Sequence, residues 1–163
     1  MIRRKWKRLH TMRRGLRKFA RADHNRRFLV VEAMVWLVAS RFALFFIPFP
    51  QLARRLGTLV PPSDPRVTEL TSARASLQAS IAGDIGWAVT RTADYLPFKA
   101  VCLPQAMAAR FMLNRRDVAS VMHFGAACNS DKSLRAHAWL DAAGLKITGY
   151  PVGDGLIEIA CFV

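Results

Sequence analysis

The spacing of apolar residues changes after residue 117, and this change limits the folds that the chain can adopt. Before it, apolar residues recur every three or four positions, which predicts helices; after it, they alternate, which predicts strands. The predicted strands are 118–128, 135–143, 145–152 and 156–163. Ala143-Gly144 predicts a tight hairpin turn between the second and third strands. Helices followed by an antiparallel sheet indicate an α+β fold, and 163 residues suit one such domain.

Basic residues are concentrated at the N-terminus. Residues 1–27 contain twelve Lys or Arg against one acid, Asp23, so they contribute +11 of the net charge of +14 and leave +3 for residues 28–163. This division predicts a basic tail or helix at 1–27 ahead of a domain at 28–163. Such a tail binds phosphates, anionic lipid or an acidic partner, or is simply a solvated helix. Because the charge lies outside the fold, a nucleic-acid partner is disfavoured.

An apolar run at 28–50 is about long enough to cross a bilayer. Glu32 and Arg41 lie within the run and disfavour a membrane span, Arg41 most strongly because it lies near the centre. We therefore expect a helix at 28–47 that the rest of the domain largely buries, followed by a short helix at 51–57. Membrane contact, aided by the basic tail, is the alternative.

A longer helix is predicted at 66–96. The turn-forming sequence Val-Pro-Pro-Ser-Asp-Pro precedes it, and Pro97 ends it. An apolar stripe at four-residue spacing runs along this helix and indicates the side that faces the core. The stripe consists of Leu77, Ile81, Ile85, Val89 and Ala93.

The three cysteines, Cys102, Cys128 and Cys161, are too scattered to indicate a disulfide framework. They form no Cys-x-x-Cys pair, and the sequence has no Gly-rich nucleotide-binding loop, so we predict no metal and no cofactor. This pattern suits a reducing, cytoplasmic setting. The long charged segment ahead of the apolar run does not fit a secretory signal.

Cys102 stands where a helix is predicted to begin. Pro104 suits the first helical turn, where the missing N–H has no partner within the helix. A thiol at a helix N-terminus faces unpaired backbone N–H groups and the positive end of the helix dipole, which favours the thiolate. Cys102 is therefore a candidate nucleophile. The alternative is a small buried apolar residue.

A nucleophilic cysteine needs a base, and His137 is the first choice. Two of the four histidines lie in the basic tail, and the other two, His123 and His137, lie on predicted strands. Because strand side chains alternate, His137, Trp139 and Asp141 share one face of their strand. A helix-borne cysteine beside a strand-borne histidine is the arrangement that cysteine hydrolases use, in which the histidine removes the thiol proton.

Three short motifs occur in the order that a known family has. They are Cys-Leu-Pro-Gln-Ala at 102–106, His-Phe-Gly at 123–125 and Ala-His-Ala-Trp-Leu at 136–140. With this set, residues 28–163 resemble the transglutaminase-like cysteine peptidases of lasso-peptide biosynthesis. The resemblance implies a papain-like or transglutaminase-like α+β fold, with Cys102 as nucleophile and His137 as base. It also implies removal of the leader from a ribosomally made precursor peptide, which frees the core N-terminus for an asparagine-synthetase-like cyclase.

The third member of the site departs from that family. In the family an Asp about a dozen residues after the histidine orients it, and here that count falls on Gly149. Asp141 lies about 13 Å from His137 along an extended strand, which is too far for a hydrogen bond. We therefore predict Asp154 for this role, with a backbone carbonyl or an amide as the alternative. His123 is the alternative base.

Some members of the family carry an N-terminal winged-helix module that binds the leader, and residues 1–27 are too short and too basic for one. The resemblance therefore implies a split arrangement, in which a separate small leader-binding protein delivers the precursor. Two other functions stay open. One is acyl transfer, in which an amine resolves the acyl-enzyme; the other is a non-catalytic basic module that binds anionic lipid or nucleic acid.

Overall fold

The computed structural model describes residues 24–72, 76–98, 100–128 and 133–163. Its first helix, α2, spans His24–Phe46. The last four residues of the predicted basic tail therefore belong to a helix of the domain. The rest of that tail lies outside the described residues.

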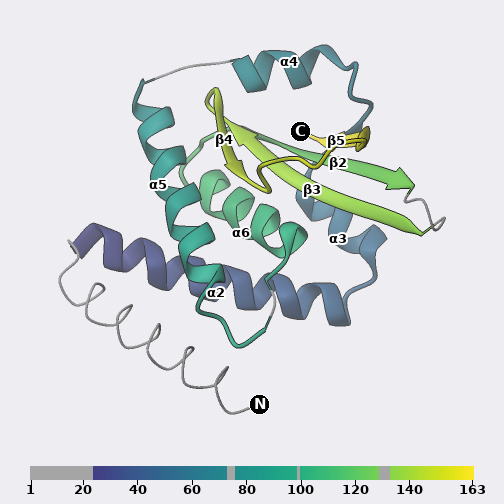
Figure 1. The fold of residues 1–163 in the computed structure, drawn as a ribbon. Helices are drawn as coiled ribbons and strands as arrows, with labels where there is room; N and C mark the ends of the chain where they lie inside the picture. Colours follow the sequence, from purple (N-terminus) through teal and green to yellow (C-terminus); the bar gives the residue numbers. More distant parts are fainter. Residues whose placement is uncertain (1–23, 73–75, 99, 129–132) are drawn as a thin grey trace.

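Four strands of a five-stranded antiparallel sheet come from the second half of the chain (Figure 1). Its strand order is β1-β5-β2-β3-β4, and each neighbouring pair is antiparallel. The strands are β1 (Leu59–Val60), β2 (Ser120–Cys128), β3 (Leu134–Ala142), β4 (Leu145–Thr148) and β5 (Ile157–Phe162). Helices precede the last four strands in the sequence, so the predicted α+β fold is confirmed.

The β3–β4 hairpin turns at Ala143 and Gly144, which confirms the predicted turn. Both residues have positive φ angles, 50° and 73°, as a two-residue type I′ turn requires. The predicted strand 145–152 is too long, because Gly149 has a φ of 82° and turns the chain out of the strand after Thr148. The two-residue β1 was not predicted, since so short a strand shows no alternation.

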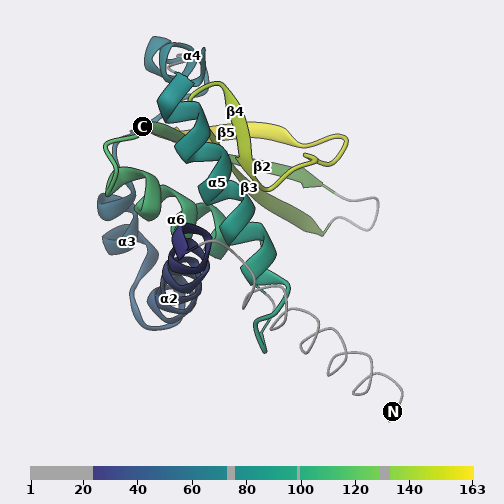
Figure 2. The same ribbon diagram turned by 90° about the vertical axis from the view of Figure 1, so that its left-hand side faces the viewer.

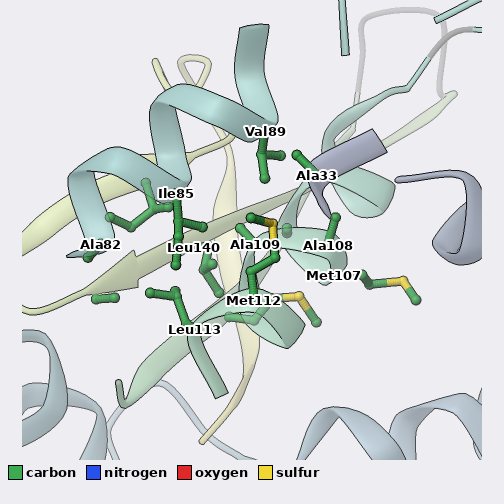
Figure 3. Packing of buried hydrophobic residues seen from close by; sticks show 14 of the residues in the cluster. Ala33, Ala82, Ile85, Val89, Met107, Ala108, Ala109, Met112, Leu113 and Leu140 are labelled. Atoms are coloured by element: carbon green, nitrogen blue, oxygen red, sulfur yellow. The ribbon is translucent and has the colours of Figure 1, made fainter. Parts of the chain in front are cut away.

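Helix α6 (Cys102–Asn114) lies between the sheet and α2 and forms the centre of the domain (Figures 1 and 2). It packs against β3 on one side and α2 on the other, and α5 packs beside it next to β4. Figure 3 shows Met112 of α6 close to Ile85 of α5 and Leu140 of β3, all three fully buried. The remaining helices are α3 (Phe49–Leu56), α4 (Pro65–Ser72) and α5 (Ser76–Ala93).

The predicted helix 66–96 is two helices, since α4 ends at Ser72 and α5 begins at Ser76. The two helices also pack in different places. Helix α5 contacts α2, α6 and β4, whereas α4 contacts β2 and β3. Val67 of α4 packs with Val121 of β2 in a small second cluster, apart from the main core that contains Met122. Because neighbouring strand residues point to opposite faces, α4 covers the face that is turned away from α6.

The predicted apolar stripe of α5 is partly right. Ile85 and Val89 are fully buried, whereas Leu77 is 72% exposed. Ala82 and Ala88 lie outside the stripe and are buried as well. Since α5 meets two helices and an edge strand, its buried surface is wider than a single stripe.

Helix α2 exists as predicted, but the expectation that the domain largely buries it is wrong. Only 22% of its most apolar 18-residue window is buried, because α5 and α6 touch one side of it. The exposed apolar residues of α2, named here the α2 face, are Phe28, Val31, Met34, Val35, Phe42, Phe45 and Phe46. By length and composition, α2 is apolar enough to cross a membrane, as signal segments and core helices also are.

Glu32 attaches α2 to the end of α6. Its buried carboxylate accepts hydrogen bonds from the Arg116 guanidinium at 2.6 and 3.1 Å. The guanidinium of Arg115 lies 3.7 Å from the same carboxylate. The charge of Glu32, which interrupts the apolar sequence of α2, is thus paired with arginines of the same domain.

Arg110 attaches α6 to the sheet. Its guanidinium donates to the carbonyl of Ser120 at 2.7 Å and to the carbonyl of Phe162 at 3.0 Å. Burial lowers the pKa of Arg110 to about 10, so the side chain stays charged at neutral pH. A buried charge bonded to both β2 and β5 fixes the position of α6 on the sheet.

Candidate active site

An open cleft of about 290 Å³ lies at the N-terminal end of α6. It is bordered by α5, α6, β3, β4 and the loop that follows β4. Its lining residues are Thr90, Cys102, Gln105, His137, Ile147, Thr148, Gly149, Tyr150 and Pro151. Cys102 and His137, which the sequence predicts as nucleophile and base, therefore line the same cleft.

Cys102 is the first residue of α6 and is partly exposed. Val101 before it is extended, and no side chain caps the helix. Instead, the Gln105 side-chain amide donates a hydrogen bond to the backbone carbonyl of Ala100 at 2.6 Å. This bond holds the segment before the helix against its first turn. The first-turn N–H groups have no partner within the helix, so the thiol lies at a positive helix end, as predicted.

His137 lies on β3 beside the loop that follows β4. Its Nε2 is 2.6 Å from the carbonyl oxygen of Gly149. A carbonyl only accepts, so Nε2 must carry the proton, and Nδ1 is left as the proton acceptor of the neutral ring. This contact fixes both the tautomer and the orientation of the imidazole.

The loop reaches His137 because β4 is short. Strand β4 pairs with β3 only over Leu140–Ala142. Next to His137 the place of an edge strand is taken by the loop, whose Gly149 carbonyl points to the ring. His137 and the start of α6 thus border the same cleft beside the end of β4.

Gly149 has no room for a side chain. A Cβ there would lie 2.4 Å from the carbonyl oxygen of Ala138 and 2.8 Å from the Cα of Trp139. Its φ of 82° is also one that residues with a side chain rarely adopt. Gly149 lies twelve residues after His137, and its backbone carbonyl makes the bond to the histidine.

The two aspartates considered for the third position have other hydrogen-bond partners in the structure. Asp154 is exposed, and its backbone carbonyl accepts a hydrogen bond from Arg135 at 2.8 Å. Asp141 accepts a hydrogen bond from the Tyr150 hydroxyl at 2.6 Å. Among the described residues, neither carboxylate has a hydrogen bond to His137. The role assigned to Asp154 stays a prediction.

His123, the alternative base, belongs to another group of side chains. Its Nδ1 lies 2.5 Å from the Glu158 carboxylate, and its Nε2 lies 3.5 Å from that of Asp141. Burial lowers the pKa of His123, but hydrogen bonds and charges from Asp141 and Glu158 outweigh it, so the pKa lies above its usual value. His123 is 5% exposed and is not among the residues that line the cleft.

Trp139 lies between the two histidines. Its ring stacks on His123 with centroids 5.4 Å apart and on His137 with centroids 6.0 Å apart. Gly125, which pairs with His137 across the strands, leaves space for the indole, because a Cβ there would lie 2.9 Å from it. On the face that His137, Trp139 and Asp141 were predicted to share, the rings of His123, Trp139 and His137 thus form one stack.

Seven of the nine lining residues were not predicted as parts of the site. Gln105 and Tyr150 are among them, and so is Gly149, whose carbonyl contacts His137. Gly149 had a signal in the sequence, namely its distance of a dozen residues from His137. Gln105 had one as well, because it lies three residues after Cys102 and residues three apart share a helix face.

Comparison with known protein families places the chain in a family. A family model described as the transglutaminase-like superfamily matches residues 43–156. That range contains Cys102, His137 and Asp154 and stops before Glu158 and Cys161. The curated proteins gave no significant match, and neither did the solved structures.

Proposed function

The chain belongs to the transglutaminase-like superfamily, and from that premise we propose that it is a cysteine peptidase that removes the leader from a lasso precursor peptide. Cys102 is the proposed nucleophile and His137 the general base. The superfamily joins cysteine peptidases and acyl-transfer enzymes, which share an acyl-enzyme step. The finer assignment to lasso precursors rests on the ordered motifs around Cys102, His123 and His137.

One observation carries the proposal. Cys102 lies at a helix start in the same cleft as His137, and the Gly149 carbonyl leaves Nδ1 of that histidine as a proton acceptor. A thiol, a base with a fixed tautomer and a set of backbone N–H donors are the groups that acyl transfer needs.

The proposed reaction proceeds in two halves. His137 takes the proton of the Cys102 thiol, and the sulfur attacks the carbonyl carbon of the scissile peptide bond. The resulting oxyanion faces the first-turn N–H groups of α6. When the C–N bond breaks, His137 returns the proton to the leaving amine, which becomes the N-terminus of the core peptide. Water, deprotonated by His137, then attacks the thioester and releases the leader carboxylate together with the thiol.

The Gly149 carbonyl performs part of what a carboxylate does in a triad. It orients the ring and fixes the proton on Nε2. Being uncharged, it stabilises the imidazolium that forms during the reaction less than an aspartate does. We therefore expect slower chemistry than in a site that has a carboxylate in this position.

The proposed partners are the precursor peptide, a separate small leader-binding protein and an asparagine-synthetase-like cyclase. In this arrangement the leader-binding protein supplies most of the affinity for the precursor, and this chain supplies the cleavage. The proposed setting is the cytoplasm. The α2 face is the largest run of exposed apolar side chains in the described helices, and a bilayer or a partner would meet the chain there.

The test is incubation of the full chain with a lasso precursor peptide and its leader-binding protein, followed by mass spectrometry. We expect free leader and core peptide from the wild type and from Cys128→Ser, the matched control at an exposed cysteine. We expect neither product from Cys102→Ala. Unchanged cleavage by Cys102→Ala would refute the assignment of the nucleophile.

Two other outcomes would change the assigned function. A leader joined through an amide bond to an added amine, formed only when Cys102 is present, would assign acyl transfer. No reaction, combined with salt-dependent binding to anionic vesicles that Cys102→Ala leaves unaltered, would assign a non-catalytic binding module.

A further inference from the structure

A second group of reactive side chains lies on the face of the sheet that is turned away from α6. His123 comes from β2, and Glu158 and Cys161 come from β5, which pairs with β2. The Cys161 thiol donates to the Glu158 carboxylate at 2.8 Å, and its sulfur lies 3.5 Å from Nδ1 of His123. One ligand atom from each of the three residues lies within 4.8 Å of the others. An imidazole, a thiol and a carboxylate therefore converge on one point.

A β-bulge produces this convergence. The register between β2 and β5 shifts between Phe124 and Gly125, so that Phe124 pairs with Ala160 and Gly125 with Glu158. Ile159 is the extra residue. In a regular strand, residues three apart point to opposite faces, so the bulge is what brings the side chain of Glu158 to the face of Cys161. Bulges that re-aim a side chain are common beside functional sites.

A second layer of polar groups supports the histidine. The Asp141 carboxylate lies 3.5 Å from Nε2 of His123, on the side of the ring opposite Glu158. The Tyr150 hydroxyl holds that carboxylate at 2.6 Å. A histidine that binds a metal through one ring nitrogen usually donates from the other to a carboxylate. Asp141 lies on the Nε2 side of the ring, where such a carboxylate stands when Nδ1 holds a metal ion, but at 3.5 Å it makes no hydrogen bond to the buried Nε2.

Burial and charge at this place favour a bound cation. His123 and Cys161 are 5% and 0% exposed, whereas the Glu158 side chain is 31% exposed and leaves a path to solvent. Two carboxylates surround one imidazole, so even with a protonated ring the group carries one excess negative charge. The domain thus holds a local negative site inside a chain whose net charge is +14.

We propose that His123, Glu158 and Cys161 bind a divalent metal ion of the zinc class on this face of the sheet. Thiolate, imidazole and carboxylate are zinc ligands, and three protein ligands leave one tetrahedral position for water. On binding, the Cys161 thiol and any protonated Nδ1 of His123 release their protons to solvent. Bonds of about 2.0–2.3 Å place tetrahedral ligand atoms roughly 3.3–3.8 Å apart, so the three atoms need to separate by about 1 Å or less.

The ion would link the bulge of β5 to β2, next to Trp139. That indole stacks on His123 and on His137, so the metal site adjoins the strand that carries the proposed base without sharing a ligand with the cleft. The proposal does not depend on the reaction at Cys102.

The test is titration of the full, chelator-treated chain with cobalt and then zinc. We expect the thiolate-to-cobalt charge-transfer absorption on adding cobalt and its loss when zinc displaces the cobalt. Cys161→Ser removes this absorption, whereas Cys128→Ser, the matched control, keeps it. Zinc also raises the unfolding temperature of the wild type and of Cys128→Ser, because an ion that binds only the folded state stabilises it.

If Cys161→Ser does not fold, two variants whose side chains keep nearly the same size still test the proposal. Glu158→Gln removes a ligand charge, and Asp141→Asn removes the charge behind His123 while keeping an oxygen that can accept from the Tyr150 hydroxyl. For Asp141→Asn we expect zinc affinity to fall by about 10- to 100-fold, as for other outer-layer partners of metal ligands. A wild type that binds zinc no more tightly than Glu158→Gln would overturn the proposal. So would cobalt absorption that persists in Cys161→Ser.

Discussion

The domain holds two cysteine–histidine pairs that differ in their surroundings. Cys102 is partly exposed in an open cleft that is also lined by His137, whose ring is held by one uncharged carbonyl. Cys161 is fully buried, beside a histidine that lies between two carboxylates. Burial and the Glu158 carboxylate also raise the pKa of the Cys161 thiol, so without a metal it stays protonated.

The difference shows that the surroundings of a cysteine and a histidine decide which chemistry the two side chains suit. In the first pair, an accessible sulfur and a free Nδ1 suit proton transfer and attack on a substrate. In the second, burial excludes a substrate, and the surplus negative charge suits a cation. The residue types alone do not distinguish a nucleophile from a metal ligand.

The largest expected difference between the pairs is in cleavage of the precursor. Cys102→Ala lowers the rate by at least about 10³-fold, because it removes the attacking atom. Cys161→Ser retains cleavage at temperatures well below its unfolding, since Cys161 does not line the cleft. Both rates are measured from leader release by mass spectrometry. Equal losses in the two variants would show that the pairs act as one site.

Alkylation separates the pairs without any substrate. We expect iodoacetamide to modify Cys102 at least about 100-fold faster than Cys161, which reacts only when the strand opens. Peptide mapping by mass spectrometry reports each cysteine, and the exposed Cys128 serves as the internal reference. His137→Ala slows the reaction of Cys102 alone. Equal slowing of Cys128 would instead indicate a general change in the protein.

Gly149→Ala tests whether the carbonyl holds His137, the proposed base. A Cβ lies only 2.4 Å from the carbonyl oxygen of Ala138, so the loop must shift and carry its own carbonyl away from His137. A displacement near 1 Å lowers the cleavage rate by about 10²-fold. The control is Gly155→Ala, which has a similar φ of 72° and nothing within 4 Å of its Cβ. If both variants keep full activity, the carbonyl does not position the base.

Gly125→Ala tests the indole that joins the two pairs. The new Cβ lies 2.9 Å from the Trp139 ring, so the ring must shift from its stacked position between the two histidines. We expect a loss of about 1–3 kcal/mol in the free energy of unfolding, measured in urea. Gly83→Ala is the control: its nearest neighbour is a Leu145 methyl at 3.8 Å, and in a helix it stabilises by about 0.5–1 kcal/mol.

The smallest effect is expected from Asp154→Asn. If the Gly149 carbonyl alone orients His137, as the 2.6 Å contact favours, the cleavage rate changes less than about threefold, within the range of surface substitutions. A fall near 10⁴-fold, typical of losing a triad aspartate, would assign the third position to Asp154. The same kinetic assay decides between the two.

The sequence by itself determined three features: helices ahead of the last four strands, the hairpin at Ala143-Gly144 and the placement of Cys102 at a helix start. Each of these depends on neighbours in the chain: periodicity, turn conformation and helix-end chemistry act over a few residues. The shared face of His137 and Trp139 also followed, because alternation along a strand is local.

Only the tertiary structure decided which partner each of these residues meets. The Gly149 carbonyl reaches His137 because β4 ends early, and Glu158 reaches Cys161 because of a bulge at Ile159. Burial of α2 was overestimated for the same reason, since composition does not specify which side of an apolar helix is covered. Such contacts depend on register and packing between segments far apart in the chain, and a linear pattern carries no information about either.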